Sequence, residues 1–113
     1  MIRQGDVWWA DLDEPIGSGA GFRRPVLIVQ CNAFNRSRIS TTVCVPLTSN
    51  LKWAGAPGNV TLKKRYTGLE KDSVANVSLI VAIDKAQLTQ CTGTLPKKQL
   101  AAVLVGINVV LGQ

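Results

Sequence analysis

Two long apolar runs dominate the pattern of hydrophobic and polar positions. They are RRPVLIVQ at residues 23–30 and TTVCVPLTS at residues 41–49. Both are β-branched and apolar along most of their length, which is typical of strands covered on both faces. Each carries a polar group at one end of the apolar run, Arg24 in the first and Thr48 in the second. The pattern therefore predicts two central strands that hold a guanidinium and a hydroxyl at their ends.

The rest of the pattern predicts short strands and one long helix. Strands are expected at residues 4–12, 59–63 and 73–81, and a brief strand or turn at residues 92–95. A helical turn is expected at residues 33–36 and the start of a short helix at residues 83–88, with Asp84 at or near its N-cap. Pro46 predicts a bulge or an edge position in the second central strand. After Pro96, apolar residues recur at spacings of three and four, which predicts an amphipathic helix over residues 96–111.

Glycine-bearing connections separate these elements. Residues 13–22 contain three glycines, at positions 17, 19 and 21, and residues 50–59 form a second long loop. Short strands, glycine-rich loops and one terminal helix predict a mainly β, α+β domain, built as a small and strongly curved barrel. The length of 113 residues fits a single domain over residues 1–113. An open barrel leaves strand edges, and a homodimer is one way to cover them.

The charge is unevenly distributed along the chain. The net charge is +6, yet four of the seven acids lie within the first fourteen residues. Residues 15–69 contain no acid and eight arginines and lysines. Such a segment would attract a polyanion, which points to nucleic acid, although a solvated basic surface with no partner is the alternative.

Composition removes several classes of protein. The chain has no histidine, which excludes a histidine general base and the commonest zinc enzymes. The three cysteines, at positions 31, 44 and 91, lack metal-site or redox spacing, so free buried thiols and no metal or cofactor are expected. No apolar run reaches the roughly 18 to 20 residues that span a bilayer, and residues 1–6 are polar, so we expect a cytoplasmic protein.

The order of short motifs resembles one family. GDVWWADLD is followed by a glycine- and serine-bearing loop, RRPVLIVQ, VPLTS, TGLEKDSVANV and IDKAQL. This order resembles the MazF/PemK family of toxin endoribonucleases from bacterial toxin-antitoxin pairs, over nearly the whole chain. The resemblance implies an SH3-like barrel, a homodimer, and metal-independent, sequence-specific cleavage of single-stranded RNA. It also implies a cognate antitoxin whose acidic C-terminal segment would lie in the same basic groove as RNA.

By position, the resemblance implies that Arg24 and Thr48 are the catalytic pair. It also places the loop before Arg24, with Gly17 and Ser18, and the segment after Thr48, with Asn50, near RNA. The ribose 2′-hydroxyl is then the nucleophile, and the products are a 2′,3′-cyclic phosphate and a 5′-hydroxyl. Arg24 can clamp phosphate oxygens and Thr48 can donate a hydrogen bond to them. The general base is left open, because arginine stays protonated in ordinary surroundings.

Each site residue also has a purely structural interpretation. Arg24 can be a surface arginine, and Thr48 a strand-end hydroxyl that bonds the backbone of its own turn. Arg23 is suited to position a phosphate. Ser73 can belong to the site or simply begin a strand. Trp53 can stack on a base or cover the barrel. Asp72 suits turn and strand-start chemistry.

Two positions depart from the family. Gly19 stands where many members have an acid, and Leu79 stands near a common glutamine, so contacts from those side chains are missing. A competing function is a non-catalytic SH3-like module that binds nucleic acid, or a toxin that poisons a protein target such as gyrase.

Overall fold

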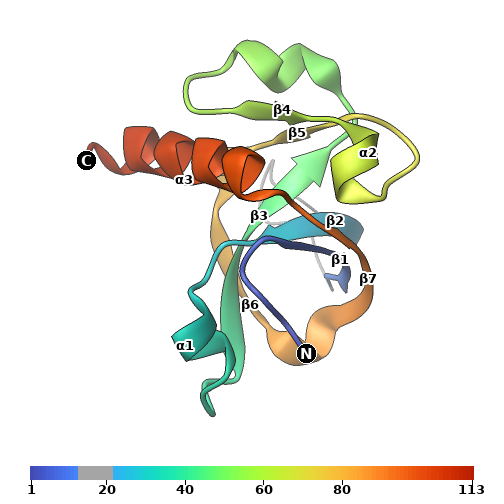
Figure 1. Ribbon diagram of the computed structural model, residues 1–113, viewed down its shortest axis with the longest axis vertical. Coiled ribbons are helices and arrows are strands. Elements are labelled where there is room, and N and C mark those ends of the chain that lie inside the picture. Colours follow the sequence, from blue (N-terminus) through green and yellow to red (C-terminus); the bar gives the residue numbers. More distant parts are fainter. Residues whose placement is uncertain (13–21) are drawn as a thin grey trace.

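The computed structural model describes residues 1–12 and 22–113, and in this part of the chain seven strands form one strongly curled antiparallel sheet (Figure 1). The strand order is β4-β5-β3-β2-β1-β7, with β6 also beside β3. The strands are β1 (Asp6–Asp11), β2 (Arg23–Ile28), β3 (Thr41–Thr48), β4 (Val60–Leu62), β5 (Ser73–Ala75), β6 (Val81–Asp84) and β7 (Leu88–Thr94). The helices are α1 (Asn32–Asn35), α2 (Lys64–Thr67) and α3 (Lys97–Leu111), and 3₁₀ turns occur at η1 (Leu51–Gly55), η2 (Val77–Leu79) and η3 (Lys85–Gln87). The predicted mainly β fold with a C-terminal helix is confirmed.

The long strand β3 organises the sheet, because it pairs with β2 on one side and with two strands on the other. Its first half, Thr41 to Cys44, pairs with β6, and its last two residues pair with β5. Pro46 lies where the neighbour changes, and its carbonyl accepts a hydrogen bond from the Asn76 N–H at 3.1 Å. The missing N–H of Pro46 therefore falls at the change of partner. The predicted bulge or edge was wrong, since Pro46 is inside a central strand.

The predicted strand over residues 73–81 is in fact two strands, β5 and β6. The 3₁₀ turn η2 separates them and carries the chain from one end of β3 to the other. The Val77 N–H in this turn donates to Asn59 Oδ1 at 3.0 Å, and the Val77 side chain is fully buried. The turn therefore joins the segment that pairs with the end of β3 to the segment that pairs with its first half.

The predicted helix at residues 83–88 is reduced to the single turn η3. Ile83 and Asp84 still belong to β6, and Leu88 already begins β7. Asp84 caps this turn as expected: its carboxylate accepts from the Ala86 N–H at 2.8 Å, and its own N–H donates to Gln87 Oε1 at 2.9 Å.

The apolar residues form two clusters, one on each face of the central strands. The first lies between the sheet and α3 and includes Leu27, Leu47 and Val103, and the second includes Ile28 and Cys44. Residues that alternate along β2 and β3 thus enter different clusters, which confirms the prediction that these strands are covered on both faces. Burial raises the pKa of the Cys44 thiol to about 12. The other two cysteines, Cys31 and Cys91, are exposed, so the expectation that all three are buried was wrong.

A buried polar network fixes α1 to the sheet. Asn35 Nδ2 donates to the Gln30 carbonyl at 2.9 Å, and Asn35 Oδ1 accepts from Gln30 Nε2 and Thr42 Oγ1, both at 3.0 Å. All three side chains are buried. The amide oxygen and nitrogen of Asn35 are thus both satisfied inside the fold, which a buried amide requires.

The two ends of the curled sheet approach each other through α2 and β7. Thr92 Oγ1 in β7 donates to the Thr67 carbonyl in α2 at 2.7 Å. Gly68 follows with φ +76°, and a Cβ on it would lie 2.0 Å from the Thr92 carbonyl oxygen. Only glycine combines the left-handed conformation with this close approach.

The helix α3 crosses the sheet and buries Val103 and Ile107 against it (Figure 1). It begins one residue later than expected, because Pro96 is the N-cap. Within the described ranges no helix is both long and apolar enough to cross a bilayer.

Candidate active site

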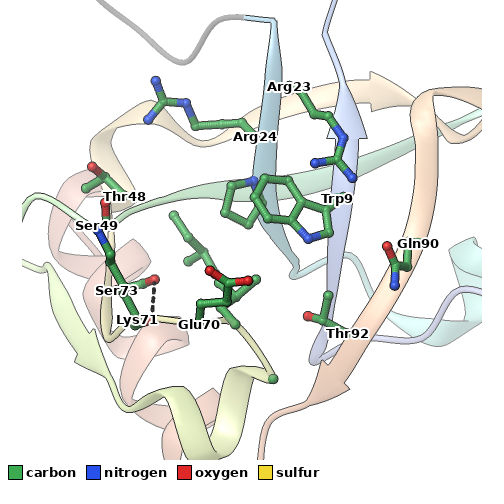
Figure 2. A pocket seen from close by; sticks show the side chains of 14 residues that line it. Trp9, Arg23, Arg24, Thr48, Ser49, Glu70, Lys71, Ser73, Gln90 and Thr92 are labelled. Atoms are coloured by element: carbon green, nitrogen blue, oxygen red, sulfur yellow. Dashed lines mark hydrogen bonds between the residues drawn. The ribbon is translucent and has the colours of Figure 1, made fainter.

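An open pocket of about 660 Å³ lies at one end of the central strands (Figure 2). Arg24, Thr48, Arg23 and Ser73 all line it. Antiparallel pairing explains why: Val26 of β2 is opposite Pro46 of β3, so residues two positions beyond each, Arg24 and Thr48, reach the same end of the sheet. The two predicted catalytic residues, which are far apart in sequence, are therefore brought to one pocket.

Thr48 is oriented by its own turn. Its Oγ1 accepts a hydrogen bond from the Asn50 N–H at 3.1 Å, which is the structural role considered for it. A threonine hydroxyl has one donor and two acceptor sites, so this bond leaves the hydroxyl proton available. The structural role and a hydrogen bond to substrate are thus compatible.

Arg24 is half-buried and reaches into the pocket from β2. In Figure 2 its side chain extends toward the side of the pocket that holds Thr48. Within residues 1–12 and 22–113, Lys63 and Asp72 form the only ion pair, at 3.6 Å, so no described carboxylate neutralises Arg24. An arginine in this position can meet an anionic group with two parallel N–H donors.

Arg23 points to the opposite wall of the pocket. Its guanidinium lies 4.3 Å from the centroid of the Trp9 ring, a cation–π geometry. Arg23 and Arg24 are successive residues of one strand, so their side chains leave the strand on opposite faces and diverge. The structure thus separates the two arginines that the sequence places together.

Ser73 begins β5 and Asp72 directly precedes it, and of the two only Ser73 lines the pocket. The Ser73 side chain is nearly buried, and its hydroxyl is 3.5 Å from the Lys71 carbonyl. Asp72 instead accepts from the Lys64 N–H at 2.9 Å and pairs with Lys63. This backbone hydrogen bond and, after it, the Lys63 ammonium hold the pKa of the Asp72 carboxyl below its usual value. The expected turn role of Asp72 is confirmed.

Asn50 and Trp53 do not line this pocket. Asn50 caps the turn η1 by accepting from the Lys52 N–H at 3.2 Å. Trp53 is 47% exposed, and the Lys52 ammonium lies 5.3 Å from the centroid of its ring. Contact of these two residues with RNA stays a prediction. Gly17, Ser18 and Gly19 lie outside the described residues.

Leu79, the second departure from the family pattern, lies in η2 and is half-buried. It is absent from the pocket lining among the residues that the structure describes.

The pocket lining also includes residues that were not singled out as site candidates from the sequence, among them Trp9, Glu70, Gln90 and Thr92. Glu70 is the only carboxylate among the described residues of the lining. Its position directly before the Lys71-Asp72-Ser73 segment is the signal that could have identified it. Gln90 has no comparable signal, because its orientation is decided by the pairing of β7 with β1. In the described part of the chain, no group of three or more histidine, cysteine, aspartate or glutamate side chains is placed to hold a metal ion.

Comparison with known proteins gives a family. Residues 3–111 match the PemK-like, MazF-like toxin of type II toxin-antitoxin systems. The chain is 40% identical over 111 residues to endoribonuclease MazF6 of Mycobacterium tuberculosis, covering 98% of this chain and 97% of that protein. It is 36% identical over 89 residues to endoribonuclease EndoA of Bacillus subtilis, covering 79% and 76%.

Solved structures agree with this relationship. MazF (Form-I) from Deinococcus radiodurans superposes with a TM-score of 0.82 at 25% identity, over 99% of this chain and 97% of that one. An endoribonuclease in complex with its cognate antitoxin, from Mycobacterial species, has the same fold, with a TM-score of 0.78 at 23% identity over 99% and 96%. The chain therefore belongs to the PemK-like, MazF-like toxin family of type II toxin-antitoxin systems.

Proposed function

We propose that this chain is an endoribonuclease toxin that cleaves single-stranded RNA at specific sequences, with the reaction at the Arg24 and Thr48 end of the pocket. The observation that carries the proposal is the convergence of these two side chains on one open pocket. The relatives that match nearly the whole chain are named endoribonucleases, which supports the same reaction.

The reaction needs little from the protein, because RNA brings its own nucleophile. The ribose 2′-oxygen attacks the adjacent phosphorus, the bond from phosphorus to the 5′-oxygen breaks, and a 2′,3′-cyclic phosphate and a 5′-hydroxyl remain. Negative charge grows on the non-bridging phosphate oxygens in the transition state. Two N–H groups of Arg24 and the Thr48 hydroxyl are suited to donate to these oxygens. The chemistry proceeds without a metal ion in this proposal.

Two protons must move during the reaction, one from the 2′-hydroxyl and one to the departing 5′-oxygen. Arg24 is poorly suited to accept a proton, since arginine stays charged in proteins. We assign the first transfer to Glu70, the only carboxylate in the described part of the pocket lining. The charge of Arg24 then serves to stabilise the phosphate.

The partners follow from the same surface. The acid-free basic segment, residues 15–69, suits both single-stranded RNA and an acidic C-terminal segment of a cognate antitoxin. We propose that the two compete for the pocket, that the toxin acts as a homodimer, and that it works in the cytoplasm. Binding of either polyanion should weaken with salt, with a log-log slope of roughly −0.7 per neutralised phosphate for single strands.

The test is cleavage of a long single-stranded RNA in EDTA, with the ends of the fragments mapped. Discrete cuts with cyclic-phosphate ends are expected from the wild type. Arg24→Lys keeps the charge but loses the paired donors, and Thr48→Val keeps the shape but loses the hydroxyl. Each should lower the cleavage rate by about 10²-fold or more.

Matched controls are Arg38→Lys and Thr61→Val, which make the same changes at exposed residues away from the pocket. Both should cleave at the wild-type rate. Full activity in Arg24→Lys and Thr48→Val would refute the site. Intact RNA after incubation with the wild type, across many sequences, would refute the reaction and favour a binding module or a protein target.

A further inference from the structure

The wall of the pocket across from Thr48 is built as one row across three strands. Trp9 of β1 is directly opposite Pro25 of β2 and directly opposite Gln90 of β7. Directly paired residues on neighbouring strands project from the same face of a sheet. All three line the pocket, and Figure 2 shows Gln90 and Arg23 on the side where Trp9 lies. This row forms a second wall of the pocket, separate from the Arg24 and Thr48 side to which the reacting phosphate is assigned.

Arg23 provides a flat, charged surface on this wall. Its guanidinium is 4.3 Å from the centroid of the Trp9 ring, which restrains the guanidinium over the ring. Arg23 is exposed, and it makes no ion pair with any described residue. One side of the guanidinium is thus held by the indole and the other is accessible. Bases of single-stranded RNA commonly stack on such guanidinium planes.

Gln90 provides unused hydrogen-bonding capacity beside that surface. Its side-chain amide has no hydrogen-bond partner among the described residues, whereas its neighbours are engaged: Thr89 Oγ1 donates to the Trp9 carbonyl at 3.2 Å and Thr92 Oγ1 to the Thr67 carbonyl. An amide offers two donors and one acceptor, which can recognise the edge of a base. Gln90 is exposed and therefore has no packing role that would explain it.

We infer that this wall is a subsite for one nucleobase beside the reacting phosphate, with the base stacked on Arg23 and its edge read by Gln90. The pocket volume of about 660 Å³ is far larger than one phosphate group needs and lies within the roughly 300 to 1,000 Å³ typical of pockets that hold organic ligands. The inference rests on the proposed action on RNA. Trp9 is a positioning residue here, because it acts through Arg23.

The first test measures binding of short 2′-O-methylated homopolymers of A, C and U, which lack a free 2′-hydroxyl and so cannot be cleaved. Gln90→Glu replaces the amide donors with acceptors. The affinity for the A and C homopolymers, whose bases present an amino group, should therefore rise relative to the affinity for the U homopolymer, whose base presents carbonyl oxygens. The ratio of affinities should shift by about fivefold or more. The matched control Gln113→Glu adds the same charge away from the pocket and should weaken all three equally.

The second test uses Arg23→Lys, which keeps the charge and removes the plane. Affinity for all three homopolymers should fall by about fivefold or more. The salt slope should stay at the wild-type value, because the number of neutralised phosphates does not change. Wild-type affinity in Arg23→Lys would refute the stacking role.

The two proposals fail in different ways. If the affinities of Gln90→Glu for the A, C and U homopolymers stand in the same ratio as those of Gln113→Glu, Gln90 does not recognise the base. This outcome would overturn the subsite even if the wild type cleaves RNA. If the wild type cleaves no RNA, the proposed reaction fails, and the homopolymer ratios still decide the subsite. In a wild type that does cleave, Gln90→Glu should also change the base preference at one position next to the cut.

Discussion

The contact between Gly68 and Thr92 gives a prediction whose size follows from the geometry. Gly68→Ala places a side chain at φ +76°, a conformation that costs L-residues roughly 1 to 2 kcal/mol. The new Cβ would also lie 2.0 Å from the Thr92 carbonyl oxygen, which is backbone and cannot rotate away. Forcing such a shift in a packed region costs about 1 to 3 kcal/mol. The free energy of unfolding should therefore fall by about 2 to 5 kcal/mol.

Two matched variants separate the causes. Gly112→Ala has nearly the same dihedral, φ +72°, and no described atom would lie within 4 Å of the new Cβ, so it reports the conformational cost alone, about 1 to 2 kcal/mol. Gly93 has no positive φ, and a Cβ there would lie 2.8 Å from the Thr67 carbonyl oxygen, so Gly93→Ala reports the close approach alone. Gly68→Ala combines both effects and should be the most destabilising of the three.

The assay is urea and thermal unfolding followed by circular dichroism. At about 4 °C per kcal/mol for a domain of this size, Gly112→Ala should lower Tm by about 4 to 8 °C and Gly68→Ala by about 8 to 20 °C. Gly68 and Thr92 both line the pocket, so the loss of this contact should also reduce RNA cleavage at temperatures where the variant is folded. If Gly68→Ala is no less stable than Gly112→Ala, the closure of the sheet through α2 and β7 is wrong.

Three further measurements test other parts of the structure. Glu70→Gln should lower the single-turnover cleavage rate by about 10²-fold or more, while affinity for uncleavable RNA stays the same or rises; an unchanged rate excludes Glu70 as the base. Asn35→Ala strands two buried donors and should cost about 2 to 3 kcal/mol in urea unfolding, and a loss below about 1 kcal/mol would contradict the buried network. Iodoacetamide should modify Cys31 and Cys91 in the native state, but Cys44 only after unfolding, as mass spectrometry can show. Because burial raises the pKa of Cys44 from 9.0 to about 12, the unfolded chain ionises first, so stability should fall as pH rises from 9 to 12, and Cys44→Ala should reduce that slope.

The local pattern of the sequence was sufficient for the elements whose stabilisation is local or periodic. The helix α3 was predictable because its buried positions, such as Val103 and Ile107, recur at helical spacing. The central strands β2 and β3 were predictable because both of their faces are buried and both are continuously apolar. Asp84 was recognisable as a cap because the hydrogen bonds of a helix cap join residues that are only a few positions apart in the sequence.

The ends of strands that depend on a neighbouring strand were not predictable in the same way. Residues 73–81 have the β-propensity of one strand, yet the chain divides at η2, because the two ends of β3 pair with different strands. The predicted edge position of Pro46 failed for the same reason. A propensity describes a residue and its close neighbours, whereas the partner of a strand is chosen by the whole sheet.

The candidate site shows the same division. The sequence by itself determined the residue types, the basic segment, the family resemblance, and the positions of Arg24 and Thr48 at the ends of two strands. Only the tertiary structure decided that β2 and β3 pair in a register that brings both residues to one pocket, and that Glu70 and Gln90 join them from α2–β5 and β7. Register and the closure of a curled sheet depend on contacts between residues far apart in the chain, and the local sequence does not encode those distances.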